Sequence, residues 1–218
     1  MGSYLVIGMG RFGSAVATEL YRRKHDVLII DEQEENVSEI VDQVTDVIIG
    51  DARDEAVLRS LDVDSFDAVI VAMASVIEDS VLTTIMLKEM GAKLIICKAN
   101  NEWHAKILTQ LGADRIIHPE SDMGRRVAQS LARQNIIDHL DISPEYGIVE
   151  MVAPKAWIGK SIVKNDLRRK YGITVVAIRS GISGMVDFSP SADRELHEGD
   201  ILTIIGSERD LDKVSAIR

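Results

Sequence analysis

The sequence predicts an α/β fold, in which a Rossmann-type doubly wound parallel sheet is followed by a second, smaller α+β domain. Short aliphatic runs alternate with longer amphipathic stretches through the first two thirds of the 218 residues. The runs are continuously apolar, as is typical of parallel strands that helices cover on both faces. The length is also sufficient for two domains, since most domains contain about 100 to 150 residues.

Six expected strands and five expected helices make up the first domain. The strands cover residues 4–8, 26–31, 46–51, 67–73, 93–99 and 115–119. The helices cover residues 11–24, 35–44, 54–61, 78–90 and 102–111, where apolar residues recur at helical spacing. Five β-α repeats that end on a sixth strand have the order of a Rossmann domain.

The pattern changes after the sixth run. We expect a helix at 123–134, a second short apolar helix or turn at 136–140, and the domain linkage around Pro144. Further strands are expected at 147–153, 173–179, 185–188 and 200–206, and further helices at 160–172 and 208–217. The chain is therefore divided into residues 1–122, an arm and linker at 123–145, and a small domain at 146–218.

The arm is too apolar for a solvated linker, and we expect it to form a dimer interface exchanged between subunits. The alternative is that it packs within its own chain. Its apolar residues are Met123, Val127, Leu131, Ile136, Ile137 and Leu140.

Composition excludes several classes of protein. A net charge of -10 argues against a nucleic-acid binder, because affinity for phosphate backbones needs a surplus of Lys and Arg. No apolar stretch approaches the roughly 20 residues of a membrane span, and no signal-peptide pattern is present. The single cysteine, Cys97, lies in an apolar run, and we expect its thiol to be buried. We therefore expect a cytoplasmic protein.

A glycine-rich loop is the most informative motif. Between the first strand and the first helix, Gly8, Gly10 and Gly13 form G-x-G-x-x-G, with Met9, Arg11 and Phe12 at the variable positions. Such a loop turns tightly, lets a pyrophosphate approach the backbone and presents the helix N-terminus to the anion. Arg11 either reaches the terminal phosphates or lies in solvent.

Acidic residues end the next two strands. Asp31 stands where a carboxylate accepts hydrogen bonds from ribose hydroxyls, and it would repel a 2′-phosphate, which disfavours NADP. Asp51 is expected near the adenine, its alternative role is to cap the helix that begins near Glu55, and the two roles can coexist. The motif therefore predicts an adenine-nucleotide site.

The residues now identify a family. Four segments closely resemble the cytoplasmic RCK (KTN) subunits of bacterial Ktr and Trk potassium-uptake systems. They are VIGMGRFGSAVATEL, IIGDARDEAVLRSL, IICKANNEWHAKILTQLGADRIIHPESDMG and SIVKNDLRRKYGITVVAIRSG. The resemblance covers essentially the whole chain and favours the Ktr type, with the small unit as the RCK C-terminal domain. It implies a regulatory subunit, dimers assembled into an octameric ring, and a membrane potassium-transporter partner.

The resemblance also implies ligands. Ktr-type subunits bind ATP and ADP, whereas Trk-type subunits can bind NAD and NADH. The nucleotide site would then include Ala52, Ala72 and Lys98 beside the loop, Asp31 and Asp51, and Arg11 would read the γ-phosphate. Glu120 resembles a family carboxylate that holds Mg²⁺, Ca²⁺ or Na⁺ near the phosphates, and its alternative role is a first-turn acid of the next helix.

A second ligand is implied for the small domain. Some Ktr-type proteins bind cyclic di-AMP at the dimer interface, where a phosphate contact would come from an arginine and the adenines would lie between aliphatic residues. The alternative is a solvated helix face with core residues behind it. The matching positions are Ile162, Asp166, Leu167, Arg168, Ile173 and Pro190.

Two other classes of function compete. An NAD-dependent dehydrogenase would need a proton-transfer residue near the nicotinamide, and only His104 and His118 could approach the crevice. Neither has an evident partner, so we expect no enzyme. A free-standing nucleotide sensor without a transporter is the other alternative, and the apolar arm argues against it.

Overall fold

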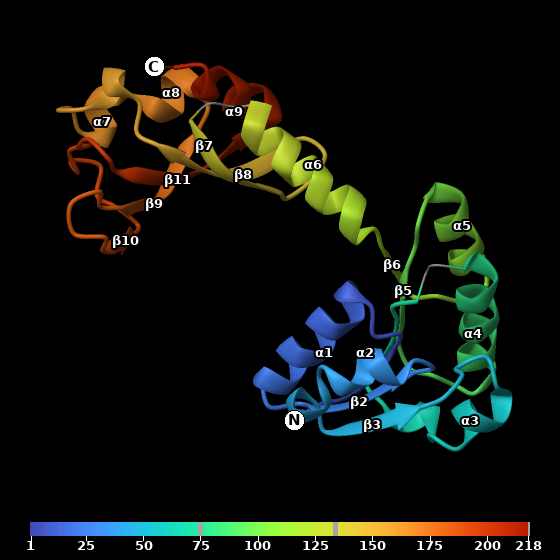
Figure 1. The fold of residues 1–218 in the computed structure, drawn as a ribbon. Coiled ribbons are helices and arrows are strands. Elements are labelled where there is room, and N and C mark those ends of the chain that lie inside the picture. The colour runs from blue at the N-terminus through green and yellow to red at the C-terminus, as the bar shows by residue number, and fades with distance from the viewer. Residues whose placement is uncertain (74–75, 133–134, 218) are drawn as a thin grey trace. The chain divides into compact units, whose positions relative to one another are not determined.

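The computed structural model describes residues 1–73, 76–132 and 135–217, and the chain divides into two compact units, Met1–Pro119 and Glu120–Arg218. Figure 1 shows both units, and each is described here by itself. The last two residues of the helix expected at 123–134 lie outside the described residues. In the described part of the chain, no helix is long and apolar enough to cross a membrane.

The first unit contains the predicted parallel sheet. Its strands are β1 (Ser3–Ile7), β2 (Asp26–Asp31), β3 (Asp46–Ile49), β4 (Ala68–Val71), β5 (Ile95–Lys98) and β6 (Arg115–Ile117). All neighbours pair in parallel, and the sheet has the order β3-β2-β1-β4-β5-β6. The chain therefore reverses direction across the sheet between β1 and β4, which is where ligands bind in such folds.

Helices cover both faces of this sheet (Figure 1). On one face lie α1 (Arg11–Arg22) and α2 (Glu34–Ser38), whose Ala17 and Val37 share a core with Val6 and Ile29. On the other face, α3 (Glu55–Arg59), α4 (Ile77–Glu89) and α5 (Glu102–Gln110) pack on a core that includes Leu5 of β1. Burial on both faces explains why the strands read as continuous apolar runs.

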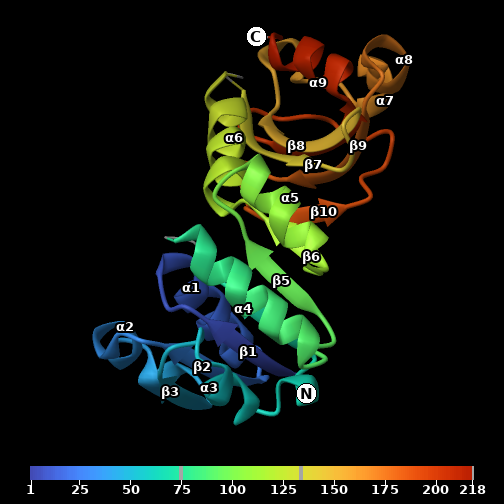
Figure 2. The ribbon, with the colours of Figure 1, turned by 90° about the vertical axis from the view of Figure 1, so that its right-hand side faces the viewer.

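The second unit is built on an antiparallel sheet in the order β10-β9-β11-β8-β7. Its strands are β7 (Ile136–Asp141), β8 (Tyr146–Val152), β9 (Thr174–Arg179), β10 (Val186–Phe188) and β11 (Ile201–Ser207). Burial alternates along β8 and β11, as expected for a sheet with one covered face. Figure 2 shows α7 (Ile162–Asn165), α8 (Leu167–Tyr171) and α9 (Glu208–Ser215) on that face.

The segment 136–140 is a strand, so the helix or turn expected there is wrong. As β7 it pairs with β8 from Ile136 to Asp141, and Pro144 lies in the turn that joins these two strands. The contacts of the chain divide instead between Pro119 and Glu120. The expected boundary at 122/123 falls inside α6 (Pro119–Ala132), and the one at 145/146 falls inside the β7–β8 hairpin.

The helix expected at 160–172 is broken into two. Residues 160–172 form α7 and α8, which are separated by Asp166 in the left-handed conformation with φ of 52°. The buried Asn165 amide stabilises this break, because its Nδ2 donates to the carbonyl oxygens of Trp157, Lys160 and Ser161.

Candidate functional site

The glycine loop connects β1 to α1 at the reversal point of the sheet. Gly8 has a φ of +92°, a conformation that favours glycine, and its N–H donates to the carbonyl of Ile30 at 2.9 Å. A Cβ on Gly8 would lie 2.9 Å from the backbone nitrogen of Met73, just beyond β4. The loops that follow β1 and β4 therefore pack closely at the edge where a nucleotide is expected.

The other two glycines have different surroundings. A Cβ on Gly13 would lie 1.9 Å from the carbonyl oxygen of Gly8, so α1 approaches the loop as closely as only glycine permits. A Cβ on Gly10 would have no heavy atom within 4 Å. Gly13 therefore holds the helix against the loop, and Gly10 leaves open space beside the backbone.

The N-terminus of α1 is free of competing side chains. Its N-cap, Gly10, supplies no side-chain hydrogen bond, and its first turn has no acidic residue. By contrast, Asp54 caps α3 and Asn101 caps α5, while α2 and α4 carry carboxylates in their first turns. The first-turn N–H groups of α1 can thus serve an anionic ligand.

Arg11 is the first residue of α1, and its side chain is exposed. Within the described ranges it makes no hydrogen bond or ion pair, so its guanidinium is available to an anion. The neighbours differ, since Met9 is buried and Phe12 packs against the core under α1. Of the variable loop positions, only Arg11 offers charge to a ligand.

Asp31 ends β2 and holds the loop. Its Oδ2 accepts from the Met9 N–H at 2.5 Å, and its Oδ1 accepts from the Gln33 N–H at 2.9 Å and from Asn36 Nδ2 at 3.1 Å. These contacts give Asp31 a structural role in the loop, and its expected contact with a ribose stays a prediction. The carboxylate fixes the conformation of the glycine loop from the neighbouring strand.

Arg53 is the residue that sequence reasoning missed. Its guanidinium bonds Asp51 at 2.8 Å, and it reaches Asp79 of α4 and Glu32 beyond β2, both at 3.2 Å. The bonded Arg53 guanidinium holds the pKa of Asp51 below its ordinary value. The only signal in the sequence was an arginine among the acids of GDARD.

The alternative role of Asp51 as a helix cap is wrong. Asp54 is the N-cap of α3, where its carboxylate accepts from the Ala56 N–H at 2.8 Å. Asp51 therefore pairs with Arg53 at the edge of the sheet.

The other expected nucleotide residues lie at or just after strand ends. Ala52 and Ala72 are buried, and the carbonyl of Ala52 accepts from Thr83 Oγ1 at 3.4 Å. Lys98 is the last residue of β5 and is partly buried. Glu120 is exposed in the first turn of α6, where its carboxylate complements the helix dipole, and its role as a cation ligand stays a prediction.

The positions expected for cyclic di-AMP are split between core and surface. Leu167 and Ile173 are buried in the core of the second unit, whereas Arg168 is exposed. Asp166 supplies the break between α7 and α8. Ile162 packs partly against that core, and Pro190 is partly buried.

Of the two histidines considered for proton transfer, His118 is partly buried, and His104 is enclosed by the fold. His104 is completely buried and lies 2.8 Å from Ser80 Oγ, and burial lowers its pKa. Burial also raises the pKa of the Cys97 thiol to about 11, so this thiol stays protonated at neutral pH. Neither group has the exposure that proton transfer to a nicotinamide requires.

Two family models match this sequence. The TrkA-N domain matches residues 4–119, and the TrkA-C domain matches residues 147–217. Ktr system potassium uptake protein C of Bacillus subtilis is 41% identical over 210 residues, which are 96% of this chain and 94% of that protein. Ktr system potassium uptake protein A of the same bacterium is 42% identical over 208 residues, which are 95% of this chain and 93% of that protein.

The fold also matches solved structures. The crystal structure of the GsuK RCK domain superposes with a TM-score of 0.68 at 18% identity, over 99% of this chain and 47% of that one. The GsuK channel bound to NAD gives a TM-score of 0.67 at 18% identity, over 99% and 39% of the two chains. This chain thus spans less than half the length of either, and the likeness establishes the RCK fold alone.

Proposed function

The chain belongs to the TrkA-N and TrkA-C domain family of Ktr-type potassium-uptake proteins, and we propose that it is a regulatory subunit that senses adenine nucleotide at its glycine loop. The subunit would act in the cytoplasm on a membrane potassium transporter. It would carry out no reaction of its own. ATP and ADP are its proposed ligands, ahead of NAD and NADH.

One observation carries the nucleotide proposal, namely the uncapped N-terminus of α1 beside an exposed Arg11 that pairs with none of the described residues. The ATP and ADP molecules differ in the terminal phosphate. A ligand shifts a conformational equilibrium only by its differential affinity for the two states. A contact from Arg11 to the γ-phosphate would supply that difference.

We expect Arg11→Ala to weaken ATP binding roughly tenfold or more and ADP binding much less. A hydrogen bond to a charged group contributes about 1.5–3 kcal/mol, and each 1.4 kcal/mol corresponds to about a factor of ten in affinity. Isothermal titration of the full chain with ATP, ADP and NAD measures the affinities.

Arg22→Ala is the matched control, because it removes the same charge at the far end of α1. Arg22 pairs there with the exposed Glu19, and such pairs contribute little. Equal losses of ATP and ADP affinity in Arg11→Ala would contradict γ-phosphate recognition. Tight NAD binding without any ATP binding would overturn the choice of ligand.

The dimer is proposed on the surface of α6 and β7. Met123, Val127 and Leu131 follow one another at helical spacing on α6 and are exposed, as are Ile137 and Leu140 of β7. A row of large exposed apolar side chains on one helix face is typical of a protein interface.

We expect Val127→Glu to lower the apparent dimer mass in sedimentation velocity, because a charge in an apolar interface must be desolvated. Arg125→Gln is the control, since it changes the net charge by the same amount on the other side of α6, where Arg125 bonds Asp122. If Val127→Glu sediments as the unaltered chain does, α6 is not the dimer interface. A monomer in both the presence and absence of nucleotide would contradict the proposed ring.

The remaining ligands are proposed on the family resemblance alone. A Mg²⁺, Ca²⁺ or Na⁺ ion would bind at Glu120 beside the nucleotide. Cyclic di-AMP would bind at the small domain, where exposed Arg168 offers charge to a phosphate.

A further inference from the structure

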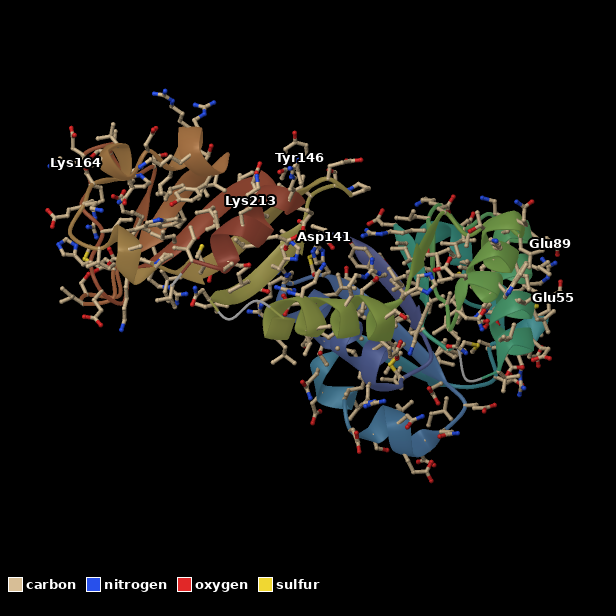
Figure 3. The ribbon with its side chains drawn as sticks, turned by 90° about the horizontal axis from the view of Figure 1, so that it is seen from above. Glu55, Glu89, Asp141, Tyr146, Lys164 and Lys213 are labelled. Carbon is tan, nitrogen blue, oxygen red and sulfur yellow. The ribbon has the colours of Figure 1, made fainter. Side chains whose placement is uncertain are left out.

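A histidine and two carboxylates meet in the second unit. His139 lies on β7, Asp141 ends the same strand, and Glu208 begins α9. His139 Nε2 is 3.0 Å from Glu208 Oε1 and 3.6 Å from Asp141 Oδ1, and the three ligand atoms all lie within 4.8 Å of one another. Asp141 and Tyr146 mark the two sides of the β7–β8 turn in Figure 3.

The imidazole is fully enclosed, whereas the carboxylates are open to solvent. The side chain of His139 is 0% exposed, that of Glu208 is 27% exposed and that of Asp141 is 50% exposed. An ion could therefore enter past Asp141 and reach a buried nitrogen.

Each ring nitrogen of His139 faces a side-chain oxygen. Its Nδ1 lies 2.9 Å from Gln129 Oε1, and its Nε2 lies 3.0 Å from Glu208 Oε1. Both oxygens are acceptors, but a neutral imidazole carries a single N–H. A cation bound to Nε2 removes this conflict, because Nδ1–H then donates to Gln129 while Nε2 and the carboxylate oxygens share the ion.

The Gln129 contact is itself typical of a metal-binding histidine. Such histidines usually donate their second N–H to a carbonyl or carboxylate, which fixes the orientation of the ring. Here the partner is a side chain of α6.

A glycine makes room for the cluster. A Cβ on Gly147 would lie 2.6 Å from both Glu208 Oε1 and His139 Nε2. Gly147 lies on β8, where it pairs with Asp141 on β7 and with Gly206 on β11. Because glycine has no side chain, β8 leaves the space between the ligands open.

We propose that His139, Asp141 and Glu208 bind a divalent transition-metal ion of the zinc type. Ligand atoms about 2.0–2.1 Å from a tetrahedral zinc ion lie roughly 3.3 Å apart. The separations of 3.0 Å to Glu208 and 3.6 Å to Asp141 bracket that value. Imidazole with carboxylate favours zinc over magnesium, which prefers oxygen ligands only.

The bound ion would join three elements of the second unit. It would link β7 to α9 directly, and it would fix α6 through Gln129. Metal occupancy would therefore set how firmly α6 is held on its sheet.

The test is isothermal titration of the full chain, purified with chelator, with ZnCl₂ and separately with MgCl₂. We expect zinc to bind with one ion per chain, and Asp141→Asn to lower that affinity at least tenfold. Asp141 is half exposed, so this variant keeps the buried histidine and the fold. Asp187→Asn, an exposed acid of β10, is the matched control and should bind zinc as the unaltered chain does.

A second measurement distinguishes a metal ion bound to His139 Nε2 from a proton at the same atom. In ¹⁵N spectra of the zinc-bound chain, His139 should carry a proton on Nδ1 and none on Nε2. Absence of zinc binding, equal zinc affinity in Asp141→Asn, or equal affinity for magnesium would each overturn the proposal. So would a His139 ring that carries both protons in the presence of zinc.

Discussion

Gly13→Ala is expected to lower the free energy of unfolding of the first unit by about 3 kcal/mol or more. The added methyl would lie 1.9 Å from the Gly8 carbonyl oxygen, which is backbone and cannot rotate away. Overpacking of a core typically costs about 1–3 kcal/mol, and a backbone collision places this variant at the upper end. The urea midpoint of unfolding measures the loss.

Cys97 gives the same measurement an independent readout. It is the single thiol of the chain, lies buried in the first unit, and has a pKa raised to about 11 by burial. Thiol reagents should therefore label it only when the unit opens. A loss of about 3 kcal/mol should raise the labelling rate roughly hundredfold.

Gly10→Ala is the matched comparison within the same loop. Gly10 has a φ of -69° and open space around its Cβ position, so this variant should fold as stably as the unaltered chain. It should still bind ATP more weakly, because the methyl occupies the space that the phosphates need. Normal stability of Gly13→Ala, or normal ATP affinity of Gly10→Ala, would contradict the roles given to these residues.

Asp31→Ala is expected to weaken adenine-nucleotide binding roughly hundredfold. The variant loses the hydrogen bond that fixes the Met9 N–H and, in addition, the proposed contacts to the ribose. Bonds to a charged group contribute about 1.5–3 kcal/mol each, so the loss of both kinds supports an effect of this size. Titration with ATP measures the affinity, and amide exchange at Met9 should accelerate.

Glu32→Ala is the control for Asp31, since the adjacent carboxylate is exposed and bonds only the partly exposed Arg53 among the described residues. Its effect on ATP affinity should be small. Wild-type affinity of Asp31→Ala would show that neither the loop anchor nor a ribose contact matters for binding.

The sequence was sufficient for the order of the first sheet and for the loop at its edge. Continuous apolar runs and G-x-G-x-x-G are local signals, and both depend on burial and backbone geometry that few other residues satisfy. The place of Asp31 beside the loop followed from its spacing. The γ-phosphate role of Arg11 came from the family resemblance and stays a prediction. Contacts that bring distant residues together, such as Arg53 with Asp79, left no local signal.

The strand β7 was missed for a physical reason. Its buried positions are Ile136 and His139, with a register irregularity between Ile136 and Asp138, while Ile137 and Leu140 face outward. The apolar residues of β7 therefore do not alternate with polar residues, and they do not all lie on one face of the strand. The buried polar residue is His139, whose partners on α6 and α9 could not be read from the sequence.

Each unit has its own hydrophobic core, and this arrangement provides a way to separate the two ligand proposals. In scanning calorimetry, two units with separate cores predict two heat-absorption peaks, provided that each unit melts cooperatively. A ligand that binds only the folded state raises the melting temperature of the unit that holds it. ATP should move the peak of Met1–Pro119 and zinc the peak of Glu120–Arg218, so one thermogram assigns each ligand to its core.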